Sequence, residues 1–128
     1  MNTCNASTLL VCSPEPEIAV ALERKLGEQR MRVVAVAPGV AFVRSVMAER
    51  PLMAVLDRVD ERPVAAQMEV ELLKIARPEV RIVVLSAHST PHDAALLKQG
   101  VLYFVAQSWR QVLAQVVDAA IQAEATRA

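Results

Sequence analysis

The sequence predicts an α/β protein with a five-stranded parallel sheet and helices on both faces. Five short apolar segments are continuous rather than alternating, as strands covered on both faces are. Longer segments with apolar residues at helical spacing separate them, and the connections are only a few residues long. This alternation favours right-handed crossovers and parallel strands. The 128 residues fit one domain, which can bury enough surface to fold without disulfides or a structural metal.

The five predicted strands are short and rich in aliphatic residues. Aromatic residues make up only 3% of the chain, so the core is expected to be aliphatic and to offer no ladder of rings for stacking bases. In chain order the strands are Thr8–Cys12, Arg32–Val36, Leu52–Leu56, Arg81–Leu85 and Leu102–Val105.

Apolar stripes at three-four spacing, typical of helices that face a core, predict the helices between the strands. A weaker and shorter helix is expected from Pro91 to Gln99, where Ser89-Thr90 before Pro91 favours a helix start. The shared faces are Ile18, Leu22 and Leu26; Val40, Val43 and Met47; Val64, Met68, Leu72 and Ile75; and, in the last helix, Trp109, Val112, Leu113, Val116, Val117, Ala120 and Ile121.

Glycines mark where several of the predicted helices and strands end. Gly27 and Gly100 follow predicted helices, and Gly39 lies in a turn after the second strand. The two tails, Met1–Ser7 and Ala123–Ala128, are expected to be loose, which leaves a single domain with a core of about residues 8–122 within 1–128.

Composition and charge exclude several classes of function. Equal numbers of basic and acidic residues, 14 of each, argue against direct nucleic-acid binding, which needs an excess of cations. No apolar run approaches the roughly 20 residues that span a bilayer, so no membrane association is expected. Two cysteines, Cys4 and Cys12, fit a reduced, cytoplasmic protein. No glycine-rich phosphate loop, nucleophile elbow or zinc-ligand spacing is present, so no enzymatic activity is predicted.

Candidate site residues follow from the predicted sheet. Sites in open parallel sheets form beyond the carboxyl ends of the strands. A carboxylate at the tip of a buried strand is unfavourable unless it is solvated, paired or used, and Asp57 follows the third strand directly. An exposed aspartate that begins a loop is the alternative. The other residues at strand ends are Ser13, Pro14 and Glu15, Ser86, and Ala106 to Ser108.

Four segments, in order and spacing, resemble the receiver domain of bacterial two-component response regulators. The resemblance covers about residues 8 to 122. Leu9–Ile18 resembles the first strand and loop of the family, and Arg50–Asp57 resembles its third strand, which ends in the phosphorylated aspartate. Val80–Ala87 resembles its fourth strand, which ends in a hydroxyl residue. Gly100–Trp109 matches the stretch that carries, in the family, a switch aromatic, a lysine, a cis-proline and a final aromatic.

The resemblance implies a flavodoxin-like fold with sheet order 2-1-3-4-5. It also implies roles for three residues. Asp57 is the candidate phosphoacceptor, Ser86 the candidate phosphate-binding hydroxyl, and Phe104 the candidate switch aromatic. Burial alone would also account for Phe104.

The chain departs from the family at the positions that bind the metal ion and at the position that supplies a cationic side chain. The acidic pair that helps hold Mg²⁺ is replaced by Ser13 and Pro14, the lysine by Gln107 and the following proline by Ser108. Phosphoryl transfer depends on such metal and cationic groups. Removing one oriented charge stabiliser often adds roughly 3–4 kcal/mol to a barrier. No cofactor is therefore expected, with Mg²⁺ relevant only if Asp57 is a working phosphoacceptor.

Two nearby residues could compensate for these losses. Glu15 could join Asp57 in binding a metal, but a first-turn helix acid beside the positive end of the helix dipole is the favoured interpretation. Arg58 could replace the missing lysine charge, but a solvated residue in a mixed charged run is favoured. We therefore expect no metal site, with Glu15 and Asp57 as weak candidates.

Three functions are weighed for this chain. The favoured one is a divergent pseudo-receiver in two-component or phosphorelay signalling, which acts by protein contact with weak or no phosphorylation. The alternatives are a working phosphoacceptor modified on Asp57 by a histidine kinase, and a flavodoxin-like domain or enzyme that binds a small ligand. Expected partners are a histidine kinase or a downstream effector. A second copy could dock on the face of the fourth helix, fifth strand and last helix, which includes Tyr103 and Trp109.

Overall fold

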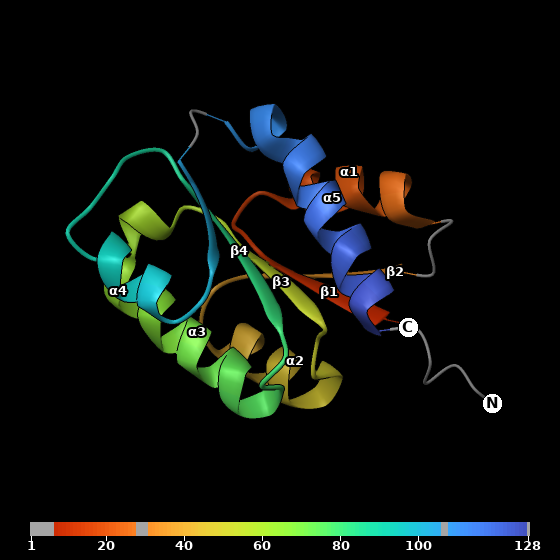
Figure 1. Ribbon diagram of the computed structural model, residues 1–128, viewed down its shortest axis with the longest axis horizontal. Helices are drawn as coiled ribbons and strands as arrows, with labels where there is room; N and C mark the ends of the chain where they lie inside the picture. The colour runs from red at the N-terminus through yellow and green to blue at the C-terminus, as the bar shows by residue number, and fades with distance from the viewer. Residues whose placement is uncertain (1–6, 28–30, 106–107, 128) are drawn as a thin grey trace.

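The computed structural model describes residues 7–27, 31–105 and 108–127 and shows a parallel sheet between two layers of helices (Figure 1). The strands are hydrogen-bonded in the order β2-β1-β3-β4-β5, and every neighbouring pair is parallel. The α/β class and the parallel sheet are confirmed. The strands are β1 (Ser7–Cys12), β2 (Met31–Val36), β3 (Met53–Leu56), β4 (Arg81–Ser86) and β5 (Leu102–Val105).

The helices cover both faces of the sheet. In Figure 1, α1 and α5 lie over one face, and α2, α3 and α4 lie over the other. None of the helices in the described part of the chain is long and apolar enough to cross a membrane. Their bounds are α1 (Pro16–Leu26), α2 (Val40–Glu49), the short 3₁₀ helix η3 (Val59–Glu61), α3 (Pro63–Ala76), α4 (Asp93–Lys98) and α5 (Trp109–Arg127).

Side-chain alternation along the strands divides the core into two layers. In β1, Leu9 and Val11 pack with the α1 and α5 side, whereas Leu10 and Cys12 pack with the α2 and α3 side. Successive residues of a strand point to opposite faces, so a strand buried on both faces must be apolar at every position. This explains the continuous apolar runs in the sequence.

The predicted core-facing stripes of α2 and α3 are wrong, whereas that of α1 is confirmed, since its three residues are buried. Val40, Val43 and Met47 are exposed, and α2 buries Phe42 and Val46 instead. Likewise, α3 exposes Val64, Met68 and Ile75, leaves Leu72 partly buried, and buries Ala66, Val70 and Leu73. Each helix carries two apolar stripes, and periodicity alone does not say which one faces the sheet.

The ends of several elements also differ from the prediction. The C-terminal tail is not loose from residue 123, because α5 continues to Arg127 and Ala123 is buried in the core. Ser7, placed in the loose N-terminal tail, pairs with Met31 at the start of β1. Helix α4 begins at Asp93 rather than Pro91. Residues 90–93 form a tight turn closed by the Asp93 N–H and the Thr90 carbonyl at 3.1 Å, and the first α-helical bond runs from the Leu96 N–H to the His92 carbonyl.

Candidate functional site

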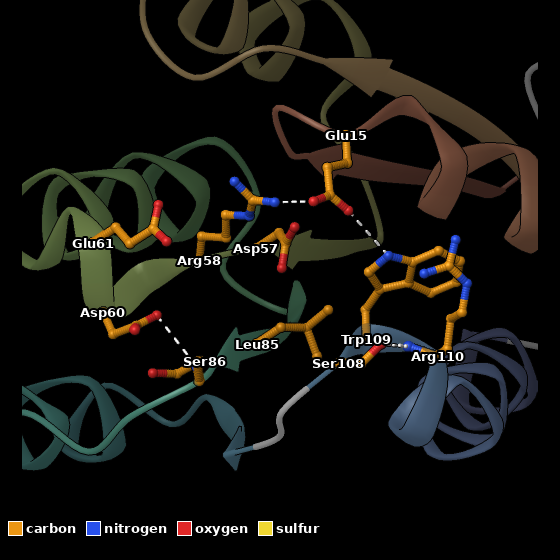
Figure 2. A pocket seen from close by; sticks show the side chains of 11 residues that line it. Glu15, Asp57, Arg58, Asp60, Glu61, Leu85, Ser86, Ser108, Trp109 and Arg110 are labelled. Carbon is orange, nitrogen blue, oxygen red and sulfur yellow. Dashed lines mark hydrogen bonds and ion pairs between the residues drawn. The ribbon is translucent and has the colours of Figure 1, made fainter.

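A cleft of about 370 Å³ lies beyond the carboxyl ends of the strands. This is the edge of the sheet where the sequence predicts a site, which stays a prediction. Figure 2 shows side chains from distant parts of the chain converging on it. Of the predicted site residues, Glu15, Asp57, Ser86, Ser108 and Trp109 line the cleft, together with Arg58.

Asp57 is buried at the base of this site. It follows β3 directly, its backbone N–H donates to the Cys12 carbonyl at 2.9 Å, and the residue is only 5% exposed. The Ser13 hydroxyl donates to Asp57 Oδ2 at 2.8 Å. Burial raises the pKa of Asp57, and the hydrogen bonds from Ser13 and from the Arg58 backbone N–H lower that pKa in part. The carboxylate is therefore paired with a hydroxyl rather than exposed in a loop.

Glu15 and Arg58 bind each other across the mouth of the cleft. The Arg58 guanidinium forms an ion pair with Glu15 Oε2, and Trp109 Nε1 donates to Glu15 Oε1 at 3.3 Å (Figure 2). Both favoured interpretations are corrected. Glu15 lies at the N-cap position just before α1 rather than in its first turn, and Arg58 is half-buried in an ion pair rather than solvated. The contact joins residues 43 positions apart, so neither local pattern reveals it.

The remaining predicted residues lie around this centre without contacting Asp57 through any hydrogen bond in the described structure. Ser86 is buried, and its hydroxyl donates to the His88 carbonyl at 2.6 Å. Ser108 accepts from the Arg110 N–H at 3.2 Å where α5 begins. Pro14 is exposed, and Gln107 lies outside the described residues.

Phe104 is partly buried against the core layer formed with α1 and α5. It lies in β5 opposite Leu85 of β4, one residue before Ser86. This position places the ring within the core, and its role as a switch stays a prediction.

Arg62, which is not among the predicted site residues, contacts the backbone of Asp57 and two buried side chains near it. It donates to the Asp57 carbonyl at 2.9 Å and forms an ion pair with the buried carboxylate of Glu69. Arg62 also donates to the Sγ of Cys12 at 3.8 Å. Burial raises the pKa of the Cys12 thiol to about 12, and at the end of β1 this side chain packs as a small, buried apolar residue. Glu69 lies on the face of α3 that the structure buries, which the predicted stripe does not include, so no sequence signal pointed to this pair.

The donor groups around Asp57 do not fit Mg²⁺. This ion binds one or two carboxylates together with other oxygen ligands in octahedral geometry. Glu15, Asp60 and Glu61 are the other acids that line the cleft. The two carboxylate oxygens of Glu15 are bound to Arg58 and Trp109, and Asp60 Oδ1 accepts from the Ala87 N–H at 3.3 Å. Within the described ranges, no three His, Cys, Asp or Glu side chains gather closely enough to hold a metal ion.

Solved structures similar to this chain are receiver domains. A response regulator from Thermotoga maritima superposes with a TM-score of 0.72 at 16% identity, covering 94% of this chain and 98% of that one. A receiver protein from Sinorhizobium medicae WSM419 gives 0.71 at 19% identity, covering 96% and 98%. The chain has the receiver fold. A Burkholderia pseudomallei response regulator, described with a phosphorylated aspartic acid, calcium ion and citrate, shares this fold at 18% identity with a TM-score of 0.64, covering 92% of this chain and 72% of that one.

Sequence comparisons add nothing to the structural likeness. No protein-family profile matches the chain, and no curated protein matches it. The receiver fold is thus recognised here from the arrangement of the strands and helices, at sequence identities below 20%.

Proposed function

We propose that this chain is a divergent receiver that transmits signals by protein contact, with weak or no phosphorylation of Asp57. The observation that carries the proposal is the hydrogen bond from the Ser13 hydroxyl to Asp57. Ser13 stands where the family resemblance implies a carboxylate that helps hold Mg²⁺. A hydroxyl that donates to the acceptor carboxylate stabilises Asp57 but brings no negative charge to a metal.

The charges in the cleft support the same conclusion. An aspartyl phosphate adds nearly two negative charges, which need cations nearby. Arg58 is already paired with Glu15, and Arg110 stacks over the Trp109 ring at 4.6 Å from its centroid. Because each missing charge stabiliser adds roughly 3–4 kcal/mol to the barrier, phosphoryl transfer to Asp57 is expected to be slower by a factor of hundreds or more.

The character of the cleft argues against the small-ligand alternative. A flavodoxin-like binder or enzyme would present a deep apolar pocket at the ends of the strands. This cleft is instead lined mainly by charged and polar groups, among them Asp57, Arg58, Asp60 and Glu61. Protein partners, a histidine kinase or a downstream effector, fit the proposal best.

Phosphorylation tests the proposal directly. The chain is incubated with acetyl phosphate and Mg²⁺, and intact mass is recorded beside an active receiver treated in the same way. We expect little or no phosphorylated chain. Asp57→Asn is the matched control, since it removes the acceptor and keeps a side chain of the same shape. Stoichiometric labelling that disappears in Asp57→Asn would establish the working phosphoacceptor instead.

A further inference from the structure

One surface of the molecule is apolar without a covering element. Val40, Val43 and Met47 on α2 and Val64, Met68 and Ile75 on α3 are 46–77% exposed. These are six of the ten large apolar side chains that are exposed in the described part of the chain. We call these six residues the α2–α3 patch. Exposed apolar residues are common singly, but several on two adjacent helices are typical of a binding surface.

Three residues of the α2–α3 patch, Val40, Val43 and Met68, line a groove between the two helices. The two helices pack side by side on the same face of the sheet (Figure 1). Between them lies a groove of about 730 Å³, whose lining includes Val40, Val43, Met68 and the partly buried Leu72. The surface therefore offers both recesses and protruding side chains. Two of these are methionines, whose flexible thioethers adapt to a partner surface.

The area of the patch suits association between proteins. A fully buried aliphatic side chain removes roughly 60–120 Å² of apolar surface from water. Six side chains about two-thirds exposed therefore offer about 250–450 Å². A standard interface buries about 800 Å² per partner, of which somewhat more than half is apolar. The patch alone supplies at least half of the apolar area that such an interface needs.

The charges beside the patch indicate which partner fits. Arg44 lies between Val40 and Met47 at helical spacing on α2, and Glu71 lies between Met68 and Ile75 on α3. Both are exposed, and within the described residues neither forms an ion pair. In a two-fold interface, if residue i of one copy contacts residue j of the other, residue j of the first copy contacts residue i of the second. If α2 of one copy crosses α3 of the next, Arg44 meets Glu71 twice.

We propose that the α2–α3 patch is the interface of a homodimer of this chain. The two copies are related by a two-fold axis, and α2 of each copy packs on α3 of the other. The net charge of zero leaves no overall repulsion between copies. This surface differs from the α4, β5 and α5 face, and dimerisation through it does not depend on phosphorylation of Asp57.

Sedimentation velocity over a wide range of concentration, without any phosphodonor, tests the proposal. We expect a monomer–dimer equilibrium for the unmodified chain. Met68→Glu places a charge in the patch and weakens the dimer at least tenfold, because that charge would be buried without a partner. The matched control is Leu97→Glu on α4, which puts the same charge on another exposed apolar residue, 52% exposed, and leaves the dimer unchanged.

Charge reversal tests the orientation of the two copies. Arg44→Glu and Glu71→Arg alone each bring like charges together twice and are expected to weaken the dimer about tenfold, whereas the double variant restores it. Both positions are exposed, so these variants are expected to fold, and circular dichroism verifies this. A wild-type monomer at every concentration overturns the proposal, as does a double variant that stays monomeric. The same is true if Leu97→Glu dissociates the dimer as strongly as Met68→Glu. None of these results bears on phosphorylation, so failure here leaves the proposed function standing.

Discussion

Replacing Ser13 with alanine removes a side-chain hydroxyl that stabilises the buried charge of Asp57. The hydroxyl donates to Asp57 Oδ2 at 2.8 Å and accepts from the Glu15 N–H at 3.0 Å. A hydrogen bond to a charged group contributes about 1.5–3 kcal/mol. Water can replace the second bond, because Glu15 is only partly buried. We therefore expect Ser13→Ala to lower the free energy of unfolding by about 2 kcal/mol at neutral pH, or Tm by roughly 6–10 °C.

The loss should depend on pH. Burial raises the folded-state pKa of Asp57 above its ordinary value, so the folded protein binds a proton at Asp57 more tightly than the unfolded chain does. For such a carboxyl group, the contribution to stability is fully present below the unfolded pKa and is lost as pH rises through the folded pKa. Ser13→Ala removes a bond to the charged form, which raises that pKa further. The difference between the two proteins is therefore largest at neutral pH and shrinks in acid, where Asp57 is protonated in both.

Urea unfolding followed by circular dichroism, repeated from neutral to acidic pH, measures this effect. Ser13→Thr is the matched control because it keeps the hydroxyl. In an Asp57→Asn background the cost of Ser13→Ala should fall to about 1 kcal/mol, the usual contribution of a neutral hydrogen bond. A change below about 0.5 kcal/mol at neutral pH, or an equal loss at every pH, would refute this account of the site.

Three further changes test neighbouring parts of the site. Arg62→Ala leaves the buried Glu69 carboxylate unpaired and should lower the free energy of unfolding by about 3–5 kcal/mol, whereas Arg62→Ala with Glu69→Leu should recover much of that loss in urea titrations. The Cys12 thiol, with a pKa of about 12, should resist maleimide at pH 8 in the native protein and react on unfolding. Peptide mapping by mass spectrometry would show this, and fast labelling of Cys12 in the native protein would contradict its burial. Ser13→Asp restores a second carboxylate beside Asp57, so calorimetry should detect Mg²⁺ binding that is at least tenfold tighter than in the unmodified chain, and equal affinities would argue against the importance of Ser13.

Some features of the candidate site could be predicted from local sequence. Asp57 directly follows an apolar strand, and Ser86 ends the next one, so the rule that sites form at strand ends places them together. The position of Ser13 beside Asp57 follows in the same way from the pairing of β1 with β3. These placements depend only on short apolar segments and on the parallel arrangement that their connections favour.

Other features could not be predicted, because they depend on contacts between distant residues. In the sequence, Glu15 matches an acid at a helix start and Arg58 matches a solvated charge, and only the fold brings their side chains together. Arg62 and Glu69 are only seven positions apart, but their pairing depends on how the chain turns at Arg62, between η3 and α3. Charged side chains carry no periodic signal that identifies their partners.

The sequence by itself determined the strands, the α/β class and the residues at the strand ends, because apolar periodicity and turn residues act locally. Only the tertiary structure decided which stripe of α2 and of α3 faces the sheet. Both stripes are apolar, and packing against the sheet buries Phe42 and Val70 while leaving Val43 and Met68 in solvent. That choice depends on the shapes of surfaces that meet only after folding, and it leaves the α2–α3 patch exposed for a partner.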